Sequence, residues 1–296
     1  MRFNKLLSLL SGYVLCYMNN YYRPSTNSIL PPVIKWVIII NVVMFLLTLA
    51  AEYFGVGQQV YNALAMHYFT SELFQPHQLV TYAFMHGGFG HLFFNMFAFW
   101  MFGAMLENHW GSKRFLIYFM FTAIGAALTQ TAFQYFEINT LAKHISVFLN
   151  HPDPYDFRIL YEQQSAGMGP EFQTFGANLA TSYEAEPNNP EIINTAIEYA
   201  NNLIPYLAST PLVGASGGVY GILLAFGMIF PNLLIYLYFF IPVKAKYFVI
   251  GYGLIELYTS MQNNQGDNVA HLAHLGGMLF GIFLILYWKK NEPTNF

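Results

Sequence analysis

The sequence predicts an all-α polytopic membrane protein, a bundle of six transmembrane helices with one long loop inserted on its outward-facing side. Three observations lead to this fold class. Charged residues make up only 9% of the 296-residue chain and hydrophobic residues 55%, whereas soluble domains carry about 25% charged residues. The apolar residues gather in six helix-length segments, and most basic residues fall on one side of them.

A helix needs roughly 20 mainly apolar residues to cross the hydrocarbon layer. Six segments meet or approach this length: 33–54, 89–108, 114–136, 215–230, 246–260 and 270–288. The fourth and fifth are short, so we expect helix tilt or local thinning of the bilayer there. Together the segments define a membrane domain over 33–290.

The ends of the chain are expected to lie outside this domain, as an N-terminal arm over 1–32 and a C-terminal tail over 291–296. The apolar stretch 6–18 follows Arg2 and Lys5, as in a signal peptide, but no small-x-small cleavage site follows it. We therefore expect a cytoplasmic arm. Cys16 is the single cysteine, so the chain can form no internal disulfide.

The placement of Lys and Arg indicates the orientation. With a cytoplasmic N-terminus, ten of the twelve basic residues lie on or near the inside, and only Lys143 and Arg158 lie outside. The loop 138–214 holds eight acidic residues and faces outward. We expect a multi-pass protein of a bacterial inner membrane, with both termini cytoplasmic and the active site facing outward.

Two outward segments differ in character. The loop 138–214 is rich in proline, and a helix is predicted from Glu191 to Leu207; about 75 residues predict a small helical cap without a strong core. The segment 55–88 is rich in aromatic residues and histidine, which favours the headgroup region.

Polar residues inside the apolar segments indicate a catalytic site. The sequence Gly-Ala-Ser-Gly-Gly at 214–218 begins the fourth segment, and Ala-His-Leu-Gly-Gly at 273–277 lies in the sixth. Polar groups within a bilayer are costly and usually mark function. We therefore predict that Ser216 is a nucleophile and His274 its base.

Glycine spacing predicts how these two helices approach each other. Proton transfer requires Ser216 Oγ within about 3 Å of a His274 nitrogen, so the backbones must lie close together. Gly217 and Gly221 are four residues apart, as are Gly277 and Gly281, and such pairs allow close helix contact. The second pair follows His274 at i+3 and i+7 on the same helix face.

An oxyanion site is predicted from the same end of the bundle. Ser216 opens a helix, where free N–H groups and the helix dipole stabilise negative charge. His91 and Asn95, four residues apart at the outer end of the second segment and preceded by His86, add donors. Glu256 and Asp267 have no spacing that places them beside His274, so a Ser-His dyad is predicted. Glu256 is expected to be paired in the bundle or to lie near an interface rather than to be catalytic.

His271 lies three residues before His274 and offers two alternatives. As the base, it lacks the glycines that follow His274 at i+3 and i+7. As a metal ligand with His86 and His91, it lacks a carboxylate or cysteine spaced to complete the set. We therefore expect neither a metal nor any other cofactor.

These residues together resemble the rhomboid family of intramembrane serine proteases over roughly 33–290. The resemblance implies Ser216 as nucleophile, His274 as base, and an oxyanion site from Asn95, His91 and the Ser216 amide. It also implies that Tyr220 packs against the catalytic imidazole, with supporting roles for the polar and small residues His86, Gly214, Gly217, Gly277, Gly281, Gly103 and Glu107. The chain departs from the family in having His77-Gln78 where many members carry Trp-Arg, and in its longer loop 138–214.

The resemblance implies a rhomboid-like bundle that hydrolyses a peptide bond in or near the transmembrane segment of a membrane protein. The expected partners are transmembrane protein substrates and the lipid bilayer, without nucleic acid; the sequence indicates no oligomeric state. One alternative is a catalytically silent rhomboid-like protein that binds client membrane proteins. Such proteins typically lack the catalytic serine or histidine, whereas this chain has both Ser216 and His274. Another is a small-solute transporter, although no inverted repeat is evident.

Overall fold

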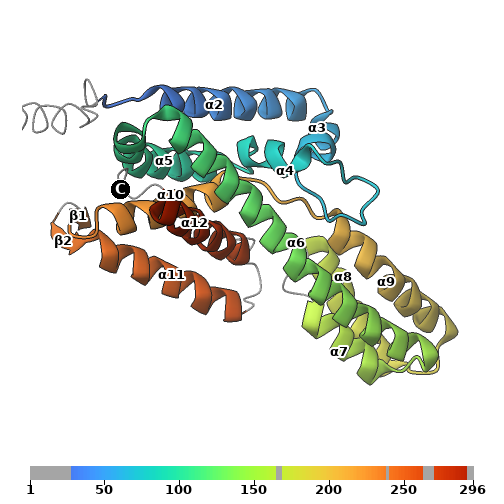
Figure 1. The fold of residues 1–296 in the computed structure, drawn as a ribbon. Helices are drawn as coiled ribbons and strands as arrows, with labels where there is room; N and C mark the ends of the chain where they lie inside the picture. The colour runs from blue at the N-terminus through green and yellow to red at the C-terminus, as the bar shows by residue number, and fades with distance from the viewer. Residues whose placement is uncertain (1–27, 165–168, 238–239, 263–269, 292–296) are drawn as a thin grey trace, which may run out of the picture.

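A computed structural model describes residues 28–164, 169–237, 240–262 and 270–291. The arm 1–27, including the apolar stretch 6–18, and the tail 292–296 lie outside the described residues, as does Asp267. Figure 1 shows two groups of helices joined by one long helix, α6. The larger group contains the helices α2 (Pro32–Tyr53), α5 (Phe89–Trp110), α6 (Ser112–Asn150), α10 (Ser216–Ile229), α11 (Ala245–Gln262) and α12 (His271–Asn291).

Four of the described helices are long and apolar enough to cross a membrane: α2, α5, α6 and α12. The helix α10 is equally apolar but has only 14 residues. The helix α11 has 18 residues, and Lys246, Glu256 and several tyrosines lower its mean hydropathy. These elements coincide with the six predicted segments to within a few residues, except at the end of α6.

The larger group has an apolar interior and an apolar exterior. Phe99, Phe115 and Phe119 are fully buried where α5 and α6 meet. Large apolar side chains also point outward along α2, α5, α11 and α12: Leu46, Phe94, Leu254 and Phe283 are more than half exposed. So wide an exposed apolar surface is a liability in water and is expected of helices that face lipid. The fold is therefore an all-α polytopic membrane protein.

The helix α6 continues well beyond its predicted end at 136. Its 39 residues make it about 58 Å long, and its distal part carries a second helical group outside the membrane bundle (Figure 1). That group is completed by α7 (Pro154–Gln164), α8 (Pro170–Ala185) and α9 (Pro190–Ser209). The helix α9 contains the predicted helix 191–207.

The second group has a core of its own, so the prediction of a cap without a strong core is wrong. Phe148, Phe157 and Tyr183 are fully buried there. The distal turns of α6 supply one wall of this core through Leu141 and Ile145. The loop forms a core because α6 contributes apolar residues that the prediction left outside any helix.

The helix α2 is fixed to α5 through a carboxylate. Glu107 accepts hydrogen bonds from the backbone N–H groups of Val33 and Ile34, both at 2.9 Å, and from the Ser112 hydroxyl at 2.6 Å. It thus satisfies two free N–H groups at the α2 N-terminus, where negative charge is favourable.

The segment 55–88 folds into short helices near the C-terminal end of α2 (Figure 1): α3 (Gly57–Leu64), α4 (Gln78–Thr81) and the 3-10 helix η1 (Tyr82–Phe84). Gln78, which departs from the family pattern, anchors this segment. Its buried amide donates to the carbonyls of Asn62 and Leu73 at 2.9 Å and accepts from the N–H groups of His67 and Gln75. Gln78 therefore satisfies four backbone groups of the segment by itself.

A small hairpin, which the sequence did not predict, lies between α10 and α11 (Figure 1). Its strands β1 (Leu234–Leu237) and β2 (Ile241–Lys244) pair antiparallel, with Ile235 opposite Val243.

Candidate active site

Ser216 is the first residue of α10 and follows an unusual backbone. Gly214 has φ +123°, a backbone conformation that glycine adopts freely and that is strained in other residues. Its N–H donates to the Tyr82 carbonyl at 2.9 Å. The first backbone bond of α10 runs from the Val219 N–H to the Ala215 carbonyl. The N–H groups of Ser216 and Gly217 precede that bond, so the helix gives them no partner.

His274 lies in the first turn of α12 and faces Ser216. Its Nε2 is 2.8 Å from Ser216 Oγ, within the range for proton transfer. Both residues sit at helix N-termini, so α10 and α12 present them at the same end of the bundle. The imidazole is buried, so it is held in place by protein rather than by solvent.

The closeness of α10 and α12 depends on Gly277. A Cβ atom at this position would lie 1.9 Å from the Gly217 carbonyl oxygen, so no larger residue fits without moving a helix backbone. The prediction for the other glycines needs correction, because they mainly accommodate α6. A Cβ at Gly221 would meet Thr122, and one at Gly281 would meet the Tyr118 hydroxyl.

Gly217 lets α10 pack closely against both α6 and α12. A Cβ there would lie 2.3 Å from the Ala126 methyl group on α6 and 3.4 Å from the Ala273 carbonyl on α12. The site is therefore built at a junction of three helices, α6, α10 and α12, rather than at the two-helix contact that the sequence predicted.

The structure places beside the predicted base a carboxylate that spacing along the chain did not. Glu256, buried on α11, places its Oε2 3.0 Å from His274 Nδ1. A carboxylate at Nδ1 fixes the imidazole tautomer and orientation, leaving Nε2 to accept a proton from the serine. The arrangement Ser216–His274–Glu256 is thus a triad in geometry. Glu256 is the functional candidate that sequence reasoning missed.

Tyr220, one turn after Ser216, contacts both the predicted base, His274, and the carboxylate of Glu256. Its ring stacks on the His274 imidazole with centroids 4.1 Å apart and an interplanar angle of 9°. Its hydroxyl donates to Glu256 Oε1. The tyrosine therefore restrains the imidazole and the carboxylate together.

His271 also contacts Glu256, and its ring lies beside that of His274, with centroids 6.2 Å apart. Its Nδ1 is 2.6 Å from the same carboxylate oxygen, Oε2, that contacts His274. Its Nδ1 also lies 3.1 Å from the Thr259 hydroxyl. Because the Nε2 atom of His274 contacts Ser216 Oγ, the geometry favours His274 as the base.

One of the predicted oxyanion residues, His91, lies beside Gly214. A Cβ on Gly214 would be 2.8 Å from His91 Nε2, so this imidazole lies against the backbone that leads to Ser216. Asn95 is nearly buried, and its amide donates to the His91 carbonyl at 3.0 Å; the second N–H of that amide remains available. His86 packs edge-on against His91, with ring centroids 5.0 Å apart.

The metal ligands considered from the sequence need revision. Among the described residues, the groups of potential ligands that converge consist of Glu256, His271 and His274, and not of His271 with His86 and His91. Glu256 is the carboxylate that spacing along the chain did not reveal.

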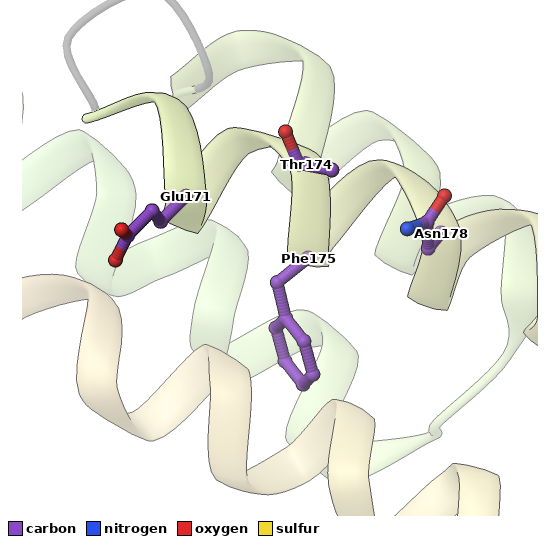
Figure 2. A pocket seen from close by; sticks show the side chains of 4 residues that line it. All are labelled: Glu171, Thr174, Phe175 and Asn178. Carbon is purple, nitrogen blue, oxygen red and sulfur yellow. The ribbon is translucent and has the colours of Figure 1, made fainter.

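A hollow elsewhere on the surface is separate from these residues. It is lined by Glu171, Thr174, Phe175 and Asn178, all on α8 of the second helical group (Figure 2). Its lining contains neither serine nor histidine, so it offers no comparable chemistry.

Comparison with known proteins identifies the family of this chain. The Rhomboid domain model matches residues 73–138 and 191–291, more than half of the chain. It leaves out 139–190, which contains all of α7 and α8. An uncharacterized mitochondrial rhomboid protein of Schizosaccharomyces pombe is 33% identical over 114 residues, which cover 36% of this chain and 28% of that protein. This chain therefore belongs to the rhomboid family of multi-pass membrane proteins.

Proposed function

We propose that this protein is an intramembrane serine endopeptidase that hydrolyses a peptide bond in or near the transmembrane segment of other membrane proteins. The rhomboid family supports intramembrane proteolysis as the class of activity. The observation that carries the proposal for this chain is the continuous contact from Ser216 Oγ through the His274 imidazole to Glu256.

The first half of the proposed reaction forms an acyl-enzyme. Ser216 Oγ attacks the scissile carbonyl carbon while its proton passes to His274 Nε2. Glu256, at Nδ1, stabilises the imidazolium that results. The carbonyl oxygen gains the negative charge, which the N–H groups at the start of α10, Asn95 and His91 are proposed to stabilise. His274 then protonates the leaving amine as the C–N bond breaks.

The second half consumes water. His274 Nε2 takes a proton from water, the hydroxide attacks the acyl carbon, and Ser216 leaves with that proton restored. The balance requires one water for each bond cut, and this chain's residues account for every proton transfer. The proposal therefore involves no metal or organic cofactor in catalysis.

The proposed membrane arrangement has six spans: α2, α5, the proximal part of α6, α10, α11 and α12. The distribution of Lys and Arg supports cytoplasmic termini, with Ser216 and the second helical group on the outer side. A bacterial inner membrane remains the proposed location, although the similar Schizosaccharomyces pombe protein is mitochondrial and lends it no support. The proposed substrate is a transmembrane helix that can unwind and that has a small residue before the cleaved bond.

A reconstituted assay tests the proposal. The purified protein is placed in lipid vesicles with a panel of single-span fusion proteins that carry Ala-Gly or Ser-Gly in the outer half of the span. We expect cleavage within or beside the span, mapped by mass spectrometry. Ser216→Ala should lose roughly 10³-fold or more of the rate while melting as the wild type does. Substantial cleavage by the Ser216→Ala variant would exclude the serine mechanism.

A further inference from the structure

The side chains around Glu256 exceed what the peptidase mechanism requires. The mechanism uses one imidazole on the carboxylate, that of His274, yet a second, that of His271, shares the same oxygen. One ligand atom from each of Glu256, His271 and His274 lies within 4.8 Å of the others. We propose that these three side chains bind a divalent zinc-type metal ion and that the bound metal switches the peptidase off.

The donor set fits such an ion. Two imidazole nitrogens and one carboxylate, with a fourth position open to water, form a common zinc site. Metal–ligand distances of 2.0–2.2 Å place the ligand atoms of a tetrahedral site about 3.4 Å apart. Glu256 Oε2 is now 2.6 Å from His271 Nδ1 and 3.0 Å from His274 Nδ1. Shifts of less than about 1 Å would therefore bring both of these distances to the tetrahedral value.

The surroundings already orient these ligands. The Tyr220 hydroxyl donates to the second oxygen of Glu256, which turns Oε2 toward both imidazoles. Such outer contacts are what position ligands in metal sites. His271 is the most accessible of the three, with 15% of its side chain exposed against 7% for Glu256. It is also the first residue of α12, which places the cluster at one end of this helix.

Metal binding and catalysis require opposite tautomers of His274. In the proposed peptidase, the neutral imidazole carries its proton on Nδ1, facing Glu256, and Nε2 accepts the proton of Ser216. A metal bound at Nδ1 uses the lone pair of that nitrogen, so the proton must move to Nε2. His274 still carries one proton, but Nε2 can no longer act as a base. Inhibition would need no movement of a helix.

This inhibition rests on the proposed peptidase function, whereas the binding site does not. Binding is therefore measured first on the Ser216→Ala protein, freed of metal by chelation and titrated with zinc in detergent. We expect one zinc ion per protein. Adding His271→Gln should weaken binding at least about 10-fold, since even outer-shell changes commonly cost 10- to 100-fold. His151→Gln, a change at an exposed histidine after α6, serves as the matched control and should bind as the parent does.

Inhibition is then measured in the vesicle assay. Zinc should abolish cleavage by the wild type, and chelation should restore it. The His271→Gln protein, compared with its own metal-free rate, should need at least about 10-fold more zinc. Melting curves verify folding, with His271→Asn as the second variant.

Two results would overturn the inference: no stoichiometric zinc on the Ser216→Ala protein, or equal zinc sensitivity with and without His271. Stoichiometric, His271-dependent binding in a protein that cleaves nothing would support the metal site and reject the peptidase function. Cleavage by a protein that binds no zinc in this way would support the peptidase function and reject the metal site.

Discussion

Replacing Gly277 by alanine should separate the proposed nucleophile from its base. The added methyl carbon would lie 1.9 Å from the Gly217 carbonyl oxygen, and ordinary contact begins at 3.4 Å. The α10 and α12 backbones must therefore move apart by about 1.5 Å. Because Ser216 precedes Gly217 and His274 lies one turn before Gly277, much of this movement should appear in the 2.8 Å Oγ–Nε2 contact.

The expected cost follows from that displacement. Misplacement by about 1 Å can lower a rate on the order of 10²-fold, and overpacking typically costs ~1–3 kcal/mol of stability. Turnover in vesicles and melting in detergent should therefore fall together, and further for Gly277→Val. Gly251→Ala on α11 is the matched control, because a Cβ there has no neighbour within 4 Å. A Gly277→Ala protein with wild-type melting and turnover would refute the proposed packing of α10 on α12.

Three further substitutions test the roles of single side chains. Glu256→Gln should lower kcat roughly 10- to 10³-fold, because a neutral amide stabilises the imidazolium poorly. An unchanged kcat would favour a Ser216–His274 dyad in which Glu256 has no catalytic role. His274→Ala should abolish turnover and labelling by a fluorophosphonate together, whereas His271→Ala should retain measurable turnover; the reverse pattern would move the base to His271. Asn95→Ala should lower kcat roughly 10- to 10³-fold with little change in KM, and a raised KM at constant kcat would make Asn95 a binding or packing residue.

The positions of the membrane helices could be predicted because each one coincides with a long run of mainly apolar residues. The predicted segment 215–230 became α10 at Ser216–Ile229, and 270–288 became α12 at His271–Asn291. The rhomboid fold class is confirmed by the family match. The number of spans stays a prediction, since α10 is short and α11 is less apolar than the other four helices.

The extension of α6 was missed because the search was for apolar length. Beyond 136 the helix is amphipathic, with Leu141, Ile145 and Phe148 at helical spacing and buried on one side. That 3.6-residue period was present in the sequence and could have predicted both the helix and the core of the second group.

Glu256 was missed for a different reason. A carboxylate inside an apolar segment is costly in a membrane and usually functional, and the same rule had identified Ser216 and His274. Spacing could not place Glu256, because the angle between α11 and α12 decides which side chains meet, and the sequence between them does not determine that angle. The tertiary structure was needed to bring it to His274 Nδ1.

Covalent labelling tests the central claim most directly. The protein in detergent is treated with a fluorophosphonate, and the modified residue is identified by mass spectrometry. We expect a single adduct on Ser216, lost in the Ser216→Ala and His274→Ala variants and reduced in Glu256→Gln, because an unactivated hydroxyl reacts poorly. An adduct confined to another residue, or cleavage by a protein whose Ser216 never reacts, would contradict the claim that His274 activates Ser216.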